Sequence, residues 1–227
     1  MIAFSSRHLW RALVGACLSL AFIVAATAAM IPTSDFEVAR TQFEAGRAGS
    51  AVANLRAQEL FAQLLRADAE NPLFLAYYGT TFTLQARDTR MPWTRIKLIN
   101  EGTSLLDRAL AHLDRPATVA RPAAVKPDAG PAALETRLVA MATFIALPEA
   151  LFHRHASAKR VYQKAIASPE FATASADLRG HVEYEGALIA RSEGDTATER
   201  ATLRRVMALA PPSIDVAEVR ARLAELH

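Results

Sequence analysis

Large hydrophobic residues recur along most of the chain at intervals of three or four positions. Between residues 36 and 65 the phenylalanines and leucines follow this spacing, which is typical of the apolar face of a helix. No segment shows a convincing alternation of apolar and polar residues, the pattern expected of a half-buried strand. The sequence therefore predicts an all-α fold.

Glycines and prolines divide this pattern into separate helices. Residues 33–35 offer N-cap side chains for a first helix, Gly46 and Gly49 separate it from a second, and Pro72 follows the end of the second. Later helices are expected over residues 73–86, 93–113, 134–147, 155–167, 175–192, 196–209 and 214–226. These helices, about nine in all, should pair into about four antiparallel hairpins, with a capping helix from Asp215 to Leu226.

One internal segment, residues 115–132, departs from the helical pattern. Its prolines and glycine stand among alanines and valines, and this composition does not continue a helix. We predict an exposed connector within a helical domain that covers residues 32–227.

The first 31 residues have the layout of a targeting or anchoring segment. Arg7 and Arg11 precede an uncharged stretch over residues 12–31, and Ala26-Thr27-Ala28 matches a signal-peptidase site. The same stretch is also long enough to span a bilayer as a helix. A cleaved signal peptide and a retained transmembrane anchor both remain open, and either places the body outside the cytoplasm.

Composition narrows the class of protein further. The chain has 48 alanines among its 227 residues, which favours helices, and its 52% apolar content excludes extensive disorder. A single cysteine, Cys17, excludes a disulfide scaffold. The 26 basic and 23 acidic residues nearly balance and form no clustered basic face, so nucleic acid is not an expected partner.

Residues 183–211 resemble a tetratricopeptide repeat (TPR). Small residues stand at the close-packing positions of its first helix, a Gly-Asp pair at the turn, apolar residues on its second helix and a proline at its end: Gly186, Ala187, Ala190, Gly194, Asp195, Leu203, Val206 and Pro211. Weaker units with irregular spacing precede it. The resemblance implies an irregular TPR-like superhelix.

The middle of the chain also resembles a group of uncharacterised bacterial TPR-like proteins. The shared landmarks follow in the same order: residues 76–79, Met91-Pro92-Trp93, Lys97, Glu101-Gly102, Leu106-Asp107, Arg137 and Leu147-Pro148. This resemblance implies an all-helical fold without an assigned activity, and an association with membrane transport systems. It adds Arg137 to the candidate binding residues.

No recognisable catalytic or metal-binding motif occurs in the sequence. His153 and His155 would point in different directions on a helix, so they do not suit one metal ion. Glu183 and Glu185 also fall on different helix faces, and we interpret them as solvated. We therefore expect a protein that is not an enzyme and has neither metal nor cofactor.

The most suggestive polar and aromatic residues lie near the start of the fourth predicted helix. Arg90, Trp93 and Lys97, with Arg95 and with Tyr77 beside them, can form a recognition patch in which an aromatic anchor is flanked by cations. In the alternative interpretation Trp93 and Tyr78 fill a widened hairpin and the charges are merely solvated.

These observations favour a non-enzymatic scaffold that binds a protein or peptide partner in the cell envelope. It would be periplasmic or tethered to the inner membrane, through residues 12–31 if they are uncleaved. An accessory subunit of a membrane transport complex and a small-ligand binding protein are the alternatives.

Overall fold

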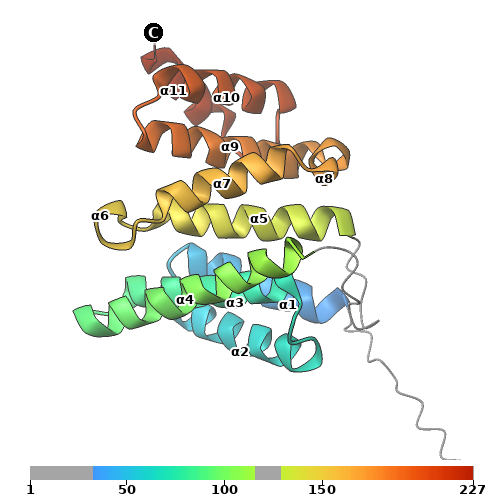
Figure 1. The fold of residues 1–227 in the computed structure, drawn as a ribbon, viewed down its shortest axis with the longest axis vertical. Coiled ribbons are helices and arrows are strands. Elements are labelled where there is room, and N and C mark those ends of the chain that lie inside the picture. The colour runs from blue at the N-terminus through green and yellow to red at the C-terminus, as the bar shows by residue number, and fades with distance from the viewer. Residues whose placement is uncertain (1–32, 116–128, 227) are drawn as a thin grey trace, which may run out of the picture. The chain divides into compact units, whose positions relative to one another are not determined.

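The computed structural model describes residues 33–115 and 129–226, and within them it contains eleven helices and no strand (Figure 1). The all-α prediction is thereby confirmed. The helices are α1 Thr33–Arg47, α2 Ala51–Ala67, α3 Pro72–Asp88, α4 Pro92–Leu113, α5 Ala129–Ala146, α6 Glu149–Phe152, α7 His155–Ile166, α8 Pro169–Thr173, α9 Ala176–Ser192, α10 Thr196–Leu209 and α11 Val216–Glu225.

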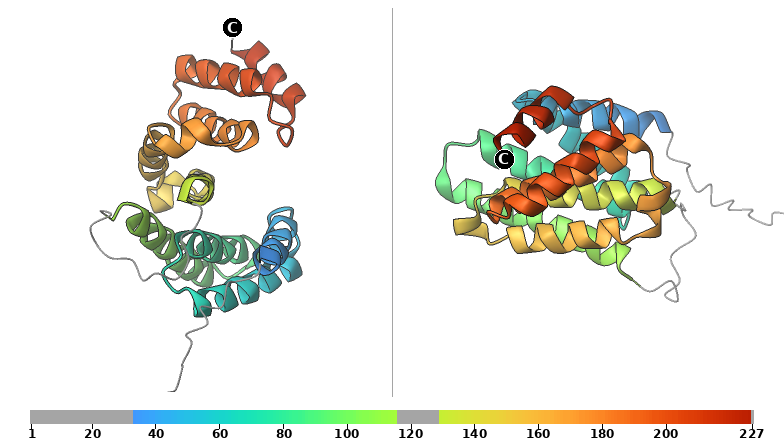
Figure 2. Two further views of the ribbon diagram at one scale, coloured as in Figure 1. Left: turned by 90° about the vertical axis from the view of Figure 1, so that its right-hand side faces the viewer. Right: turned by 90° about the horizontal axis from the view of Figure 1, so that it is seen from above.

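The long helices pack in consecutive pairs. The pairs are α1 with α2, α3 with α4, α5 with α7, and α9 with α10, and α11 packs on α10. Each pair also contacts the next through α2 and α3, α3 and α5, or α7 and α9, so the hairpins follow one another in chain order (Figures 1 and 2). Four hairpins and a terminal helix thus form the body, as the hydrophobic pattern predicts.

The predicted connector is shorter than expected at its C-terminal end. Residues 129–132 belong to α5, although they include Gly130 and Pro131. Proline is tolerated in the first turn of a helix because the amide hydrogen that it lacks has no intrahelical acceptor there. The rest of the predicted connector, residues 116–128, lies outside the described residues.

Two single-turn helices, α6 and α8, were absent from the sequence-based prediction. Helix α6 follows Pro148 and ends at His153, whose backbone is left-handed with φ of 52°. Helix α8 begins with Pro169, and the Ser168 hydroxyl caps it by accepting a hydrogen bond from the amide of Phe171. Segments of four or five residues are too short to show a helical period.

No helix in the described part of the chain is long and apolar enough to cross a membrane. The predicted signal peptide or anchor, residues 1–31, lies outside that part.

Helices α3 and α4 approach so closely that their backbones meet at Gly79 and Gly102. A Cβ atom on Gly79 would lie 2.7 Å from the carbonyl oxygen of Gly102, and one on Gly102 would lie 2.5 Å from that of Gly79. Neither position therefore accepts a side chain without moving the helices apart. The crossing fixes α4 near its midpoint.

An aromatic cluster fills the space between the first two hairpins. The ring of Tyr77 stacks on that of Phe61 with centroids 5.1 Å apart, and Phe36 and Phe43 meet it edge-on. The Tyr77 hydroxyl donates a hydrogen bond to Glu135 of α5, and Arg40 of α1 lies 4.0 Å from the same carboxylate. Burial raises the pKa of Glu135.

Two further buried carboxylates connect the C-terminal helices. Glu183 of α9 accepts hydrogen bonds from the Tyr162 hydroxyl of α7 and from Arg205 of α10. Glu199 of α10 accepts hydrogen bonds from Arg191 of α9 and Arg222 of α11. Each carboxylate thus bonds side chains of two other helices.

We predict that Tyr77→Phe lowers the free energy of unfolding by about 1–3 kcal/mol, because Glu135 keeps its burial and loses its hydrogen-bond donor. Urea unfolding of both proteins measures the difference. Tyr184→Phe is the control: the hydroxyl of Tyr184 bonds the exposed Glu218 at 3.4 Å, so its removal should change stability by less than about 0.5 kcal/mol. Equal losses in the two variants would contradict the role given to Glu135.

Candidate functional site

The five candidate residues from the sequence lie in three different places. Tyr77 is 4% exposed and belongs to the aromatic cluster, so it is not available to a partner. The expectation that it lies beside Trp93 is wrong, because Tyr77 occupies the face of α3 that packs on α1 and α2. Arg90, Trp93 and Lys97 stay together at the beginning of α4, and Arg137 lies elsewhere, on α5.

Trp93 is 71% exposed, which excludes the interpretation that it fills the hairpin. Three other large apolar side chains are also at least half exposed: Met91 and Ile96 at the beginning of α4, and Leu151 of α6, whose neighbour Phe152 packs against the cluster that holds Ile99 of α4. We call these four residues the edge patch.

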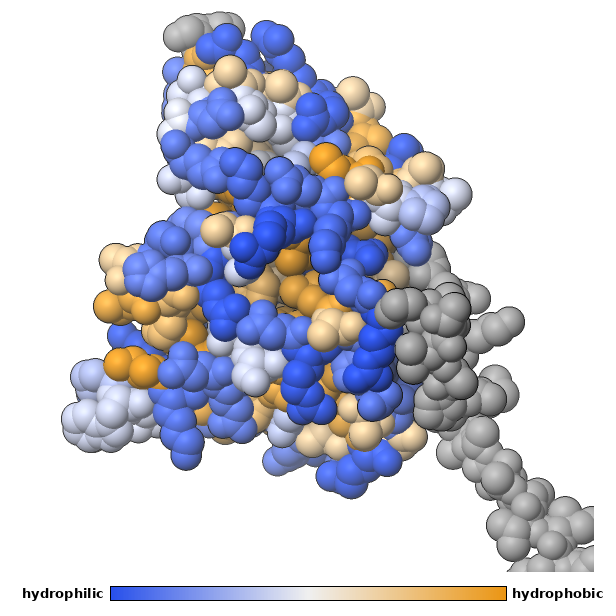
Figure 3. Space-filling view, in the orientation of Figure 1, coloured by the Kyte–Doolittle hydropathy of each residue, from blue (hydrophilic) through white to orange (hydrophobic). Residues whose placement is uncertain are grey.

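A small core cluster explains why α4 and α6 meet at this edge. Ile99 of α4 and Leu147, just before α6, are buried together, and Phe152 of α6 packs against them. Figure 3 shows hydrophobic residues gathered at the left edge of the molecule, over α6 and the beginning of α4. Exposed apolar side chains grouped in this way are typical of an interaction surface.

The cations beside the edge patch differ in what they bind. Arg95 donates to the carbonyl oxygens of Ala86 and Thr89, at 3.2 and 2.8 Å, and so closes the end of α3. Arg90 and Lys97 are exposed and make no hydrogen bond or ion pair with any described residue. Two cations thus remain available around an apolar centre.

The sequence analysis missed Met91, Ile96 and Leu151 as members of this surface. Met91 and Ile96 flank Trp93, so the same segment carried the signal for them. Leu151 lies in a one-turn helix, and nothing in its local sequence indicates that α6 folds against α4.

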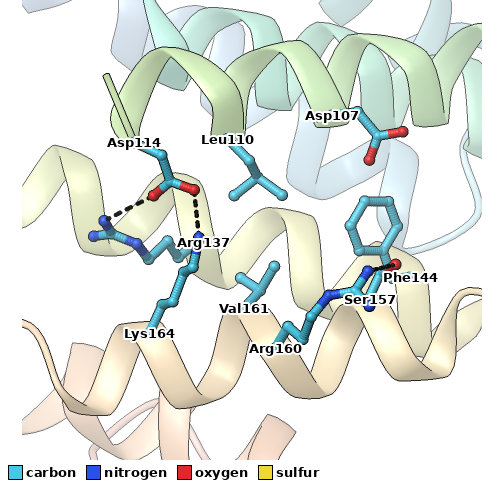
Figure 4. Close-up of a pocket in the computed structure, with 9 residues that line it drawn as sticks. All are labelled: Asp107, Leu110, Asp114, Arg137, Phe144, Ser157, Arg160, Val161 and Lys164. Carbon is cyan, nitrogen blue, oxygen red and sulfur yellow. Dashed lines mark hydrogen bonds and ion pairs between the residues drawn. The ribbon is translucent and has the colours of Figure 1, made fainter. Parts of the chain in front are cut away.

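A second candidate site is a groove between α4 and α7, floored by α5, with a volume of about 140 Å³ (Figure 4). We call it the α4–α7 groove. Leu110, Val161 and Phe144 provide its apolar surface. Its charged and polar lining consists of Asp107, Asp114, Arg137, Ser157, Arg160 and Lys164. Figure 3 shows it near the centre of the view, as apolar residues framed by hydrophilic ones.

Ion pairs bridge the α4–α7 groove near both ends. Arg154, which precedes α7, donates to both oxygens of Asp107 at 3.0 and 2.9 Å, and its guanidinium lies 5.2 Å from the centre of the Phe144 ring. Lys164 donates to Asp114 at 2.6 Å. Both carboxylates of the lining are therefore already bonded to cations of the opposite wall.

Among the described residues, Arg137 has no ion pair as short as these two. Its side chain is 13% exposed, and its nearest carboxylate oxygen, on Asp114, lies 4.0 Å away, beyond hydrogen-bond distance. Its Nη1 atom is buried and has no hydrogen-bond partner among the described residues. The resemblance that drew attention to Arg137 assigned it no role, and the structure places it in the floor of the groove.

The two neighbouring histidines do not share a site. His153 is the exposed C-cap of α6, and the ring of His155 lies against the carbonyl oxygen of Leu147, with Nε2 3.2 Å from it. Among the described residues no group of three or more histidine, cysteine, aspartate or glutamate side chains is placed to hold a metal ion.

The interpretation of Glu183 and Glu185 as solvated residues is wrong. Glu183 is buried in its hydrogen bonds to Tyr162 and Arg205. Glu185 lies on another face of α9, and its Oε2 atom is buried with no hydrogen-bond partner in the described part of the chain. Burial raises the pKa of Glu185 to about 7, and the positive charge of Arg47 on α1 only partly opposes this shift. Sequence position alone does not reveal that neighbouring helices cover this face.

Comparison with known proteins adds no family assignment, since no family model, curated protein or solved structure matches the chain. The chemistry of the edge patch and the α4–α7 groove therefore carries the functional argument.

We predict that Glu185 makes stability depend on pH. Its pKa is raised from 4.5 to about 7 on folding, so the native state binds a proton more tightly than the unfolded state does. The resulting stabilisation is complete below about pH 4.5 and is lost as the pH rises to about 7, to a total of roughly 3 kcal/mol. Urea unfolding across this range should show Glu185→Gln gaining stability relative to the wild type as the pH rises.

The exposed Glu101, one of the acids of α4, supplies the matched control. Glu101→Gln should follow the wild-type pH profile. Parallel profiles for the wild type and Glu185→Gln would show that Glu185 is ionised as readily in the folded protein as in the unfolded chain.

Proposed function

We propose that the protein is a non-enzymatic interaction module that binds a partner protein through the edge patch. The observation that carries the proposal is the exposure of Trp93, Met91, Ile96 and Leu151, which ranges from 50% to 71%. Elsewhere in the described residues, clusters of buried apolar side chains fill the spaces between hairpins, and the other exposed large apolar side chains, Val38, Val52, Leu55 and Ile166, include no aromatic residue. Unpartnered apolar side chains from two different helices are unfavourable in water, and a partner would cover them.

The composition of the edge patch favours a protein partner. Tryptophan is among the residues that most often dominate binding energy, and exposed arginine and lysine at the rim guide association without a large desolvation cost. Arg90 and Lys97 supply that rim. The complementary surface would be an apolar segment with acidic residues beside it.

We further propose that the hairpins form a TPR-like superhelix. Close helix packing at a small residue supports this: a Cβ atom on Gly186 would lie 2.4 Å from the ring of Tyr162, so this position of α9 requires glycine. Ala187 and Ala190 are also buried where the repeat pattern has small residues. The irregular spacing of the other units makes the superhelix a divergent one.

The proposed location is outside the cytoplasm, either periplasmic or tethered to the inner membrane. The support for this location is a feature of the sequence alone: Arg7 and Arg11 precede the uncharged residues 12–31, which is the layout of a signal peptide or a membrane anchor. A tethered module would suit an accessory subunit of a membrane transport complex.

We predict that Trp93→Ala abolishes recovery of the partner and leaves stability nearly unchanged. Proteins captured from envelope extract by the full chain are identified by mass spectrometry, and the variant should lose a protein that the wild type retains. Val38→Ala is the matched control, because Val38 is 52% exposed near the beginning of α1, a helix that contributes no residue to the edge patch, and its truncation should lose nothing.

Thermal unfolding distinguishes this role from a structural one. An exposed Trp93 should contribute less than about 1 kcal/mol, whereas truncation of a buried tryptophan costs about 3–5 kcal/mol. Unchanged recovery by Trp93→Ala, or a large loss of stability, would exclude the edge patch as the docking site.

We predict that alkaline phosphatase fused after His227 is active in bacterial cells, since this enzyme folds only outside the cytoplasm. Removal of residues 1–31 from the same fusion should abolish its activity. An inactive fusion of the full chain, with a cytoplasmic reporter active in its place, would contradict the proposed location.

A further inference from the structure

We propose that the edge patch receives an acidic amphipathic helix of the partner protein, which packs along the beginning of α4. This helix would place its apolar face on Trp93, Ile96 and Leu151 and its carboxylates beside Arg90 and Lys97. The docking site is that of the proposed function, on which this inference rests.

One face of α4 has a neighbouring helix along only part of its length. Residues three, four or seven positions apart share one side of a helix, and on α4 this side carries Trp93, Ile96, Asn100, Asp107 and Asp114. Asp107 pairs with Arg154 at the beginning of α7, and Asp114 pairs with Lys164 further along α7. Helix α7 therefore begins beside Asp107 and accompanies only the second half of α4. Before Asp107 the same face continues, and there Trp93 and Ile96 are at least half exposed.

The uncovered length of α4 suits a helix rather than a short loop. Residues 92–106 precede Asp107 and extend about 22 Å along the axis of α4. Helix α6 lies at the same edge of the molecule (Figure 1), but it has only four residues, and its own Leu151 is 70% exposed. A single turn cannot cover this length, whereas a helix of about four turns matches it.

The form of the surface also favours a helical occupant. Trp93 and Ile96 are three positions apart, so they belong to one of the side-chain ridges that a second helix packs against. The described part of the chain contains no strand, so it has no sheet edge to which an extended segment could add.

The charge of the edge selects an acidic helix. No acidic residue lies between Asp88 and Glu101, and Arg90 and Lys97 are exposed without a hydrogen bond or ion pair to any described residue. The positive end of the α4 dipole adds to their charge. In the second half of α4, acids of α4 pair with cations at α7. In the first half the cations are on α4, so the incoming helix must supply the acids, and a basic helix would be repelled.

The fluorescence of Trp93 tests the proposal. The sequence has two tryptophans, so the full chain with Trp10→Phe reports on the edge patch alone. The probe is the peptide acetyl-EALLEALLEALLEA-amide, an acidic amphipathic helix former, and its counterpart has lysine in place of every glutamate. We expect the acidic peptide to shift the emission of Trp93 to shorter wavelength in a saturable way, because the indole leaves water. The basic peptide should bind at least tenfold more weakly.

A third peptide and two variants separate helix, charge and position. The acidic peptide with proline at its two central alanines keeps its charge, cannot form the helix and should bind at least tenfold more weakly. The double variant Arg90→Gln with Lys97→Gln should weaken binding of the acidic peptide at least tenfold. Arg108→Gln, which changes an exposed arginine of α4 outside the edge patch, should leave that binding unchanged. All three positions are exposed, so these variants should fold.

The outcomes separate this inference from the proposed function. Absence of binding by the acidic peptide, equal binding of the three peptides, or wild-type affinity in the double variant would overturn the acidic helix as the occupant. A shift of the Trp93 emission by phosphatidylglycerol vesicles and not by the acidic peptide would overturn it in favour of a lipid surface. The proposed function fails by a different observation, namely that Trp93→Ala retains every protein that the wild type captures from envelope extract.

Discussion

The backbone contact between Gly79 and Gly102 fixes the position of α4, and both candidate sites depend on that helix. The contact lies at the middle of a helix of 22 residues, so α4 extends about 15 Å from it in each direction. One half carries Trp93 and Ile96 of the edge patch. The other half forms a wall of the α4–α7 groove with Asp107, Leu110 and Asp114. A side chain at either glycine would displace both sites together.

Buried carboxylates give an alanine-rich fold part of its specificity. Alanine surfaces pack closely and are nearly alike, so they distinguish poorly between one neighbouring helix and another. Glu135, Glu183 and Glu199 each accept hydrogen bonds from side chains of other helices, and a shifted helix would leave a buried charge unpaired. Glu185 differs from these three, because no described residue bonds its Oε2 atom and burial favours its protonated form.

Local features of the sequence were sufficient to predict most of the helices. Gly46, Gly49 and Pro72 mark the ends of the first two helices because glycine and proline act on the backbone of their own segment. The beginning of α5 was misplaced because Pro131 reads as a helix breaker unless its position in the first turn is known. Helix α6 lacked the length that a periodic pattern needs.

The site residues were harder to predict, because exposure depends on which helices cover each face. Trp93 and Tyr77 are both aromatic residues near a hairpin, yet one is exposed and the other is buried in a cluster from three other helices. Arg137 appeared only as one landmark in a resemblance. Its nearest carboxylate, Asp114, bonds Lys164 instead. Lys164 lies 27 positions after Arg137 in the sequence, and the packing of α7 on α5 brings the two together.

The placement of both sites on one helix determines how they would influence each other. Trp93 and Asp107 are 14 positions apart on α4, a separation of about 21 Å along the helix axis. Changes at positions more than about 10 Å apart that share no partner usually add in free energy. Asp107 and Asp114 of α4 form ion pairs with Arg154 and Lys164, whereas the core cluster where α4 meets α6 is made of other residues, among them Ile99, Leu147 and Phe152. With no bonded side chain in common, the edge patch and the α4–α7 groove should respond to substitutions independently, so that a change in one leaves the other intact.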